Sequence, residues 1–224
     1  MQAWVCGGAG MRFFSYDSKF SQLILRICWA CYLNLLWFVF SIPVITIGAS
    51  TTALYYVSLK IVREEEHNIT GLFLRSFKEN FKQATVLWLI MLAIGTILGG
   101  DFYILAHLRS HTTGSLAVFW TLLLALVIAM TVLYVIILIY LFPLTASVVN
   151  TNLAMIKNSF FIGTHYLFCT ILIFAIHFAM FFLVVRVFTP LIMFGEGLCA
   201  LLSSYLLSNV IAACSCDPED SADE

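Results

Sequence analysis

The sequence has little charge and few prolines. Charged residues make up 10% of the chain, against about 25% in typical soluble domains, and 4 of the 224 residues are proline. Hydrophobic residues make up 62%, which is more apolar surface than a water-soluble fold of this length can bury. The composition therefore excludes a soluble protein and predicts an all-α, polytopic membrane protein.

Motifs for catalysis and cofactor binding are also missing. The sequence has no glycine-rich phosphate loop, no nucleophile elbow and no paired-carboxylate motif. His107 and His111 have the i, i+4 spacing of metal ligands, but Arg109 lies between them and no further ligand is evident. We therefore expect no enzymatic activity, no cofactor and no metal, and the basic residues do not form a nucleic-acid-binding pattern.

Six apolar runs have about the length that a bilayer requires. A single transmembrane domain is predicted over residues 1–216, with Met11 as an alternative start, and an acidic, disordered tail over residues 217–224. The second run is the least apolar, and we expect it to be short and irregular. Its small hydroxyl residues favour close packing between helices. The predicted spans are residues 22–41, 44–62, 84–106, 116–142, 166–185 and 188–212.

Residues 41–50 separate the first two spans. Pro43 removes a backbone donor and disfavours helix at the residue before it, and Gly48 relaxes the backbone again. Such a break is tolerated in a membrane where protein or water satisfies the freed backbone groups. The stretch is therefore predicted to be a turnaround between two membrane helices.

Residues 72–83 follow an amphipathic pattern. Phenylalanines recur every four residues on one face, and charged residues lie opposite them. This pattern is typical of a helix in the membrane interface that contacts anionic lipid headgroups or docks a partner. The alternative is a helix that leads into the third span and packs on the bundle. The residues concerned are Phe73, Phe77 and Phe81 on the apolar face, and Arg75, Lys78 and Lys82 on the other.

The distribution of lysine and arginine tests the turnaround. Cytoplasmic loops of membrane proteins carry an excess of these residues. With six spans and both termini in the cytoplasm, all but Arg109 and Arg186 lie on the cytoplasmic side or at its boundary. If residues 44–62 did not cross, that asymmetry would largely disappear. We therefore predict a multi-pass plasma-membrane protein with cytoplasmic termini.

Four ionisable residues inside or beside the spans are candidate functional residues, because such groups are costly in lipid. Glu196 lies between two glycines in the last predicted span and is suited to proton coupling or substrate contact; a structural pair with Arg186 is the alternative. His177 lies near the centre of the fifth span, as a proton relay or a hydrogen-bonded packing residue. Asp101 lies towards the outer end of the third span.

Several segments between residues 11 and 90 are similar to the YesL-like family of small bacterial membrane proteins. They include Phe14-Ser-Tyr-Asp-Ser-Lys-Phe20, Asn34-Leu-Leu-Trp37, Ser41-Ile-Pro-Val-Ile-Thr-Ile-Gly48, Thr52-Ala-Leu-Tyr-Tyr56 and Leu87-Trp88. Beyond residue 90 the likeness is looser, and Phe194-Gly-Glu-Gly197 departs from it. The family has no assigned biochemical activity, and the resemblance implies genes placed beside carbohydrate importers.

The expected function is therefore that of a membrane protein that assists or regulates saccharide uptake together with an ABC-type importer. The alternative is a small transporter that acts as a homo-oligomer. The importer's subunits, a second copy of the chain and the lipid bilayer are the expected partners. A permease role within the importer itself is excluded, because residues 145–165 lack the Glu-Ala-Ala and Asp-Gly pattern of that loop.

Overall fold

The computed structural model describes residues 19–65, 68–186 and 192–215 of the protein. Every regular element within these ranges is a helix, which confirms the predicted all-α class. The predicted start at Met11 and the tail at residues 217–224 lie outside the described ranges. The elements are α1 (Lys19–Ser41), η2 (Val44–Thr46), α2 (Ile47–Val62), α3 (Ile69–Ser110), α4 (Ser115–Ser147), α5 (Asn152–His165), α6 (Leu167–Arg186) and α7 (Ile192–Ser215).

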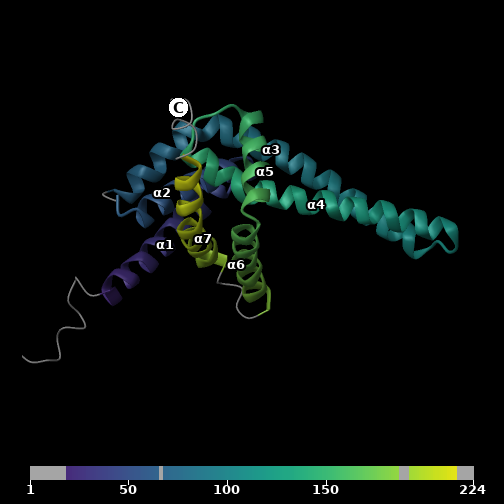
Figure 1. Ribbon diagram of the computed structural model, residues 1–224. Coiled ribbons are helices and arrows are strands. Elements are labelled where there is room, and N and C mark those ends of the chain that lie inside the picture. Colours follow the sequence, from purple (N-terminus) through teal and green to yellow (C-terminus); the bar gives the residue numbers. More distant parts are fainter. Residues whose placement is uncertain (1–18, 66–67, 187–191, 216–224) are drawn as a thin grey trace, which may run out of the picture.

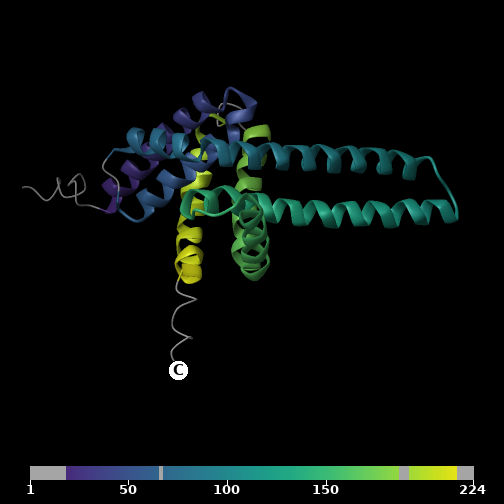
Figure 2. The ribbon, with the colours of Figure 1, turned by 90° about the horizontal axis from the view of Figure 1, so that it is seen from above.

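Helices α3 and α4 form a long antiparallel hairpin that extends to one side of the molecule (Figure 1). Their 42 and 33 residues correspond to lengths of about 63 Å and about 50 Å, well beyond the roughly 30 Å of a bilayer's apolar core. Helices α1, α2 and α7 pack together at the opposite end of the hairpin (Figures 1 and 2). In both views α6 and α7 run across the direction of the hairpin, so these helices do not form one parallel bundle with it.

Five stretches of the described chain are long and apolar enough to cross a membrane. They are residues 24–41 in α1, residues 44–62, and the helices α3, α4 and α6. The described apolar stretch of α7, Gly195–Ile211, is shorter than the others, and residues 188–191 of the predicted sixth span lie outside the described ranges. The structure therefore supports a protein embedded in the membrane by several helices, and the sixth span stays a prediction.

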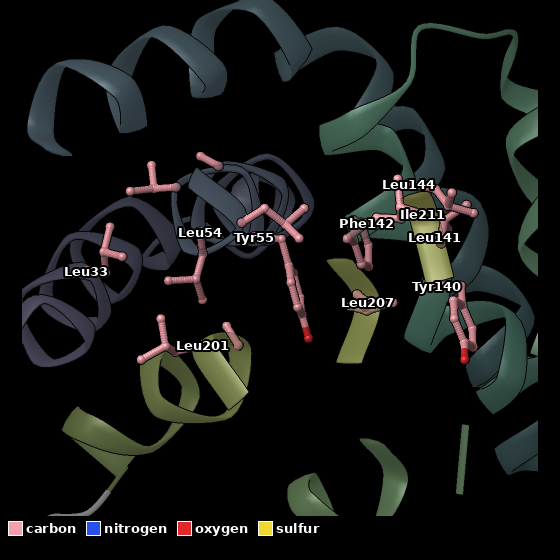
Figure 3. Packing of buried hydrophobic residues seen from close by; sticks show 14 of the residues in the cluster. Leu33, Leu54, Tyr55, Tyr140, Leu141, Phe142, Leu144, Leu201, Leu207 and Ile211 are labelled. Carbon is pink, nitrogen blue, oxygen red and sulfur yellow. The ribbon is translucent and has the colours of Figure 1, made fainter. Parts of the chain in front are cut away.

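Helix α2 lies at the centre of the helical bundle, where it contacts α1, α3, α4 and α7. In Figure 3, Leu54 of α2 faces Leu33 of α1 and Leu201 of α7 within one hydrophobic cluster. Ser50 and Thr52 of α2 are fully buried and donate their hydroxyls to carbonyls one turn earlier. The weak hydropathy of this stretch thus reflects contact with other helices rather than lipid. The span that we expected to be irregular has a one-turn irregular start, η2, followed by regular α-helix.

Residues 72–83 are the first part of α3 and not a separate helix, because no break divides them from the third span. Their aromatic face packs on the bundle. Phe73 is fully buried, and both Phe73 and Phe77 contact the ring of Phe40 in α1. Of the two alternatives considered for this segment, the structure favours the helix that leads into the third span. The opposite face remains in solvent, with Arg75, Lys78 and Lys82 exposed.

Pro143 does not end the fourth span as predicted, since α4 continues to Ser147 with the proline inside it. A proline inside a helix removes one backbone hydrogen bond and bends the helix. Here the surrounding residues Tyr140 to Thr145 are all buried, and the hydroxyls of Thr145 and Ser147 donate to carbonyls four residues earlier. Packing thus holds this last turn in helical form, and α5 follows as a short connecting helix.

Candidate functional site

The turnaround between α1 and α2 is tied together by its own hydroxyl groups. Helix α1 ends at Ser41, and the Thr46 hydroxyl lies 2.6 Å from the Phe40 carbonyl and 2.7 Å from the Pro43 carbonyl. The hydroxyls of Ser41 and Ser50 are 2.6 Å apart, which links the last turn of α1 to the first turns of α2. Backbone groups that the break at Pro43 frees are thus satisfied within the protein, as a membrane requires.

Two tryptophans fasten this turnaround to its neighbours. The Trp88 indole in α3 donates to the Val44 carbonyl at 2.8 Å, and the Trp37 indole in α1 donates to the Thr51 hydroxyl at 3.0 Å. Gly48 lies against α3, where an added Cβ would fall 2.5 Å from the Ala84 carbonyl oxygen. Only glycine permits so close an approach of α2 to α3.

An ion pair joins the opposite ends of the same two helices. Arg26 near the start of α1 donates to Glu64 just after α2 at 2.7 Å, and it also donates to Tyr205 of α7. The start of the first predicted span and the residues just after the second therefore lie at one end of the bundle. This placement agrees with a turnaround at residues 41–50.

Next to the turnaround, the bundle contains a cavity of about 360 Å³. This volume is within the range of small-molecule sites, roughly 300–1,000 Å³. Its wall is mostly apolar and aromatic, with a few polar groups. It is lined by Trp37 of α1, Ile47, Thr51 and Tyr55 of α2, Trp88 of α3, Val135, Leu138, Ile139 and Phe142 of α4, Phe174 and His177 of α6, and Glu196 of α7.

His177 and Tyr55 meet at one side of the cavity. The His177 Nδ1 lies 2.9 Å from the Ile173 carbonyl oxygen, which can only accept, so this nitrogen carries a proton. The other nitrogen, Nε2, lies 3.5 Å from the Tyr55 hydroxyl. A neutral imidazole with the proton on Nδ1 satisfies both contacts, with Tyr55 as the donor to Nε2.

Glu196 reaches the same cavity from the first turns of α7. The backbone amide of Gly197 donates to the Asn34 side chain of α1 at 2.7 Å, and an added Cβ at Gly197 would fall 2.9 Å from the Asn34 Cβ. This close approach fixes the start of α7 against α1. The Glu196 side chain is half-buried and close enough to interact electrostatically with His177. Within the described residues it has neither a hydrogen bond nor an ion pair.

The other two intramembrane candidates lie elsewhere. Asp101 is exposed on the outer half of the α3–α4 hairpin and does not line the cavity. Arg186 is exposed at the end of α6, and the alternative pair between Arg186 and Glu196 is not among the ion pairs of the described chain. The rings of His107 and His111 are 4.5 Å apart at the tip of the hairpin. No group of three or more metal-ligating side chains occurs in the part of the chain that is described.

A second charged region is formed by the end of α2, the loop after it and the first part of α3. Lys60 donates to Glu65, and this hydrogen bond together with the ammonium charge lowers the pKa of the Glu65 carboxyl. In the first part of α3, the hydrogen bond from Arg75 to Glu79, 2.9 Å long, raises the pKa of the guanidinium group. Lys78 and Lys82 are exposed without an ion pair in the described residues, so they are the unpaired cations of this face.

Sequence reasoning missed the aromatic half of the cavity. Trp37, Tyr55 and Trp88 were noted only as matching residues in a family resemblance, and Thr51 only as a packing hydroxyl. Aromatic residues are too common in membrane helices to single out a site. The available signal was that all three aromatic residues fall in the segment where the likeness to other proteins is densest.

Residues 30–102 match a family described as "Protein of unknown function, DUF624". The match covers less than half of the chain, from α1 through most of α3, and it includes Trp37, Tyr55 and Trp88 but neither His177 nor Glu196. It agrees with the expected likeness to an uncharacterised family in this part of the chain, and it does not bear on the YesL-like designation. No curated protein and no solved structure matches the chain.

Proposed function

We propose that the protein is an integral membrane protein that regulates solute uptake and binds a small solute in the cavity beside the turnaround. The observation that carries this proposal is the convergence of Tyr55, His177 and Glu196 on one cavity within the helical bundle. A concave, largely apolar site with a few converging polar groups is the usual form of a ligand site. Ionisable residues are retained in membrane helices mainly where they serve such a role.

The partner in this proposal is an ABC-type importer, and the imported solutes are saccharides. The resemblance to the YesL-like family supports both points. The cations Lys78 and Lys82 lie on the exposed face of the first part of α3. Rim charges of this kind set partner choice and the rate of association. This face is therefore the proposed contact with the importer.

Affinity purification from the native membrane in mild detergent tests the partnership. We expect the unmodified protein to retain an importer's permease or ATPase, and the Lys78→Glu, Lys82→Glu double variant to lose most of it. Replacing the exposed Arg109 by Glu at the opposite end of α3 is the matched control and should leave the retention unchanged. A stable homo-oligomer without importer subunits would contradict the proposal.

The second candidate function is transport by the protein itself. It is favoured by the placement of Glu196 next to His177 in the cavity, since intramembrane carboxylate and imidazole groups are the usual elements of proton pathways. In this case Glu196→Gln should abolish proton flux into liposomes loaded with a pH-sensitive dye. Asp101→Asn, outside the cavity, should leave it unchanged. An equal flux in the unmodified protein and the Glu196→Gln variant would remove this function.

A further inference from the structure

Few polar groups of the cavity wall are available to bind a ligand, because some of them already have partners in the protein. The indole N–H groups of Trp37 and Trp88 are already bonded to the Thr51 hydroxyl and the Val44 carbonyl. These two side chains therefore offer a ligand only ring surface. Tyr55, Phe142 and Phe174 add further rings to the wall. The lining is thus an aromatic enclosure with a small number of available polar groups.

Glu196 is the one carboxylate among the lining residues, and it forms no ion pair within the described residues. Both nitrogens of His177 are already engaged, one with the Ile173 carbonyl and the other with the Tyr55 hydroxyl. No lysine or arginine lines the cavity. An unpaired carboxylate in apolar surroundings is unfavourable, so a ligand that carries a positive charge would stabilise the ionised form of Glu196.

We propose that this cavity binds a small organic cation with an ammonium or quaternary ammonium group. Glu196 provides the opposite charge, and the rings of Trp37, Tyr55 and Trp88 provide cation–π contacts, the combination that recognises such cations in other proteins. A saccharide fits less well, because its buried hydroxyls would lack hydrogen-bond partners on this wall. The inference rests on the proposed solute cavity, and it makes the cavity ligand a different molecule from the imported saccharide.

The test compares choline with its neutral analogue 3,3-dimethyl-1-butanol, in which carbon replaces the charged nitrogen. The full-length protein in lipid nanodiscs carries Phe at Trp4, Trp29 and Trp120, so that fluorescence reports on the two cavity tryptophans. We expect choline to change this fluorescence at a concentration at least about tenfold lower than the alcohol requires. Glu196→Gln should remove that preference without changing the response to the alcohol. Asp101→Asn is the matched control and should change neither response.

Each other outcome overturns the inference. Equal responses to choline and the alcohol, or a choline preference that survives in Glu196→Gln, would show that charge is not recognised. A response to glucose alone would show that the cavity binds a solute of another class, which leaves the proposed solute cavity in place. If none of the three compounds changes the fluorescence, the solute cavity itself is wrong. Size-exclusion profiles confirm that each variant remains folded.

Discussion

At the scale of single residues, two glycines set how closely the central helices approach. Gly48 lets α2 contact the backbone of α3, and Gly197 lets α7 contact the backbone of α1 while its amide bonds to Asn34. Without a hydrophobic driving force between helices in lipid, close packing of this kind contributes much of the stability of a membrane bundle. The same two contacts position Thr51 and Glu196 at the cavity.

A larger side chain at Gly48 is predicted to destabilise the bundle. In Gly48→Leu, the side chain meets the Ala84 carbonyl and the Trp88 Cβ, both fixed parts of α3. Overpacking typically costs about 1–3 kcal/mol, so the melting temperature in detergent should fall by several degrees.

The matched control is Gly99→Leu in α3, where no atom lies within 4 Å of an added Cβ. Leucine is the better helix former by up to about 1 kcal/mol, so this variant should melt at the same temperature or slightly higher. Equal losses in the two variants would contradict the role given to Gly48.

Of the ionisable and aromatic residues that line the cavity, the ionisable pair was singled out from the sequence and the aromatic ones were missed. Glu196 and His177 were predicted because an ionisable group in an apolar run is conspicuous on its own. That they share a cavity was not predictable, since they are on different helices and their meeting depends on how α6 and α7 pack. Tyr55 was missed for a different reason. An aromatic side chain in a membrane helix carries no sign of its neighbours until the fold brings His177 beside it.

At the scale of helices, hydropathy separates contact with lipid from contact with protein. Helix α4 is the most apolar of the candidate spans and α2 the least, yet α2 lies at the centre and much of α4 is exposed along the hairpin. The stretch over residues 44–62 is long and apolar enough to cross a membrane, as predicted, and its helix is more regular than we expected. The hydroxyl groups of Ser50 and Thr52 bond within the helix, so these two cost little when they are buried against other helices.

The first part of α3 shows where an amphipathic pattern is ambiguous. The stripe of Phe73, Phe77 and Phe81 indicates an apolar face, but the pattern is the same whether lipid or protein covers it. The structure resolves this through Phe40, a residue more than thirty positions earlier that no local pattern connects to the stripe. The continuation into the third span was one of the two alternatives, and the sequence could not decide between them because the charged face makes residues 72–83 look like a separate element.

At the scale of the whole molecule, the ion pair between Arg26 and Glu64 is relevant to the predicted topology. It places the start of α1 and the end of α2 at one end of the bundle, whereas the loop between α3 and α4 is at the tip of the hairpin (Figure 2). The predicted topology assigns the first end to the cytoplasm and the tip to the outside.

Cysteine labelling of intact cells tests this assignment, in a background in which the seven native cysteines are replaced. Lys78→Cys, on the exposed face of α3, should react with an impermeant maleimide only after the membrane is opened. Thr113→Cys, exposed at the hairpin tip, is the matched control and should react in intact cells. Labelling of position 78 from outside would reverse or remove the predicted crossings.

The bond from the Trp88 indole to the Val44 carbonyl imposes an order on biosynthesis. When α2 leaves the ribosome, the turnaround lacks both this donor and the surface of α3 that Gly48 contacts. The nascent chain then holds a segment of low hydropathy whose packing surface has not yet met α3, and such a segment gains little from contact with lipid. We therefore expect α2 to reach its final position only after α3 has been synthesised, with the first three helices packing together as one unit.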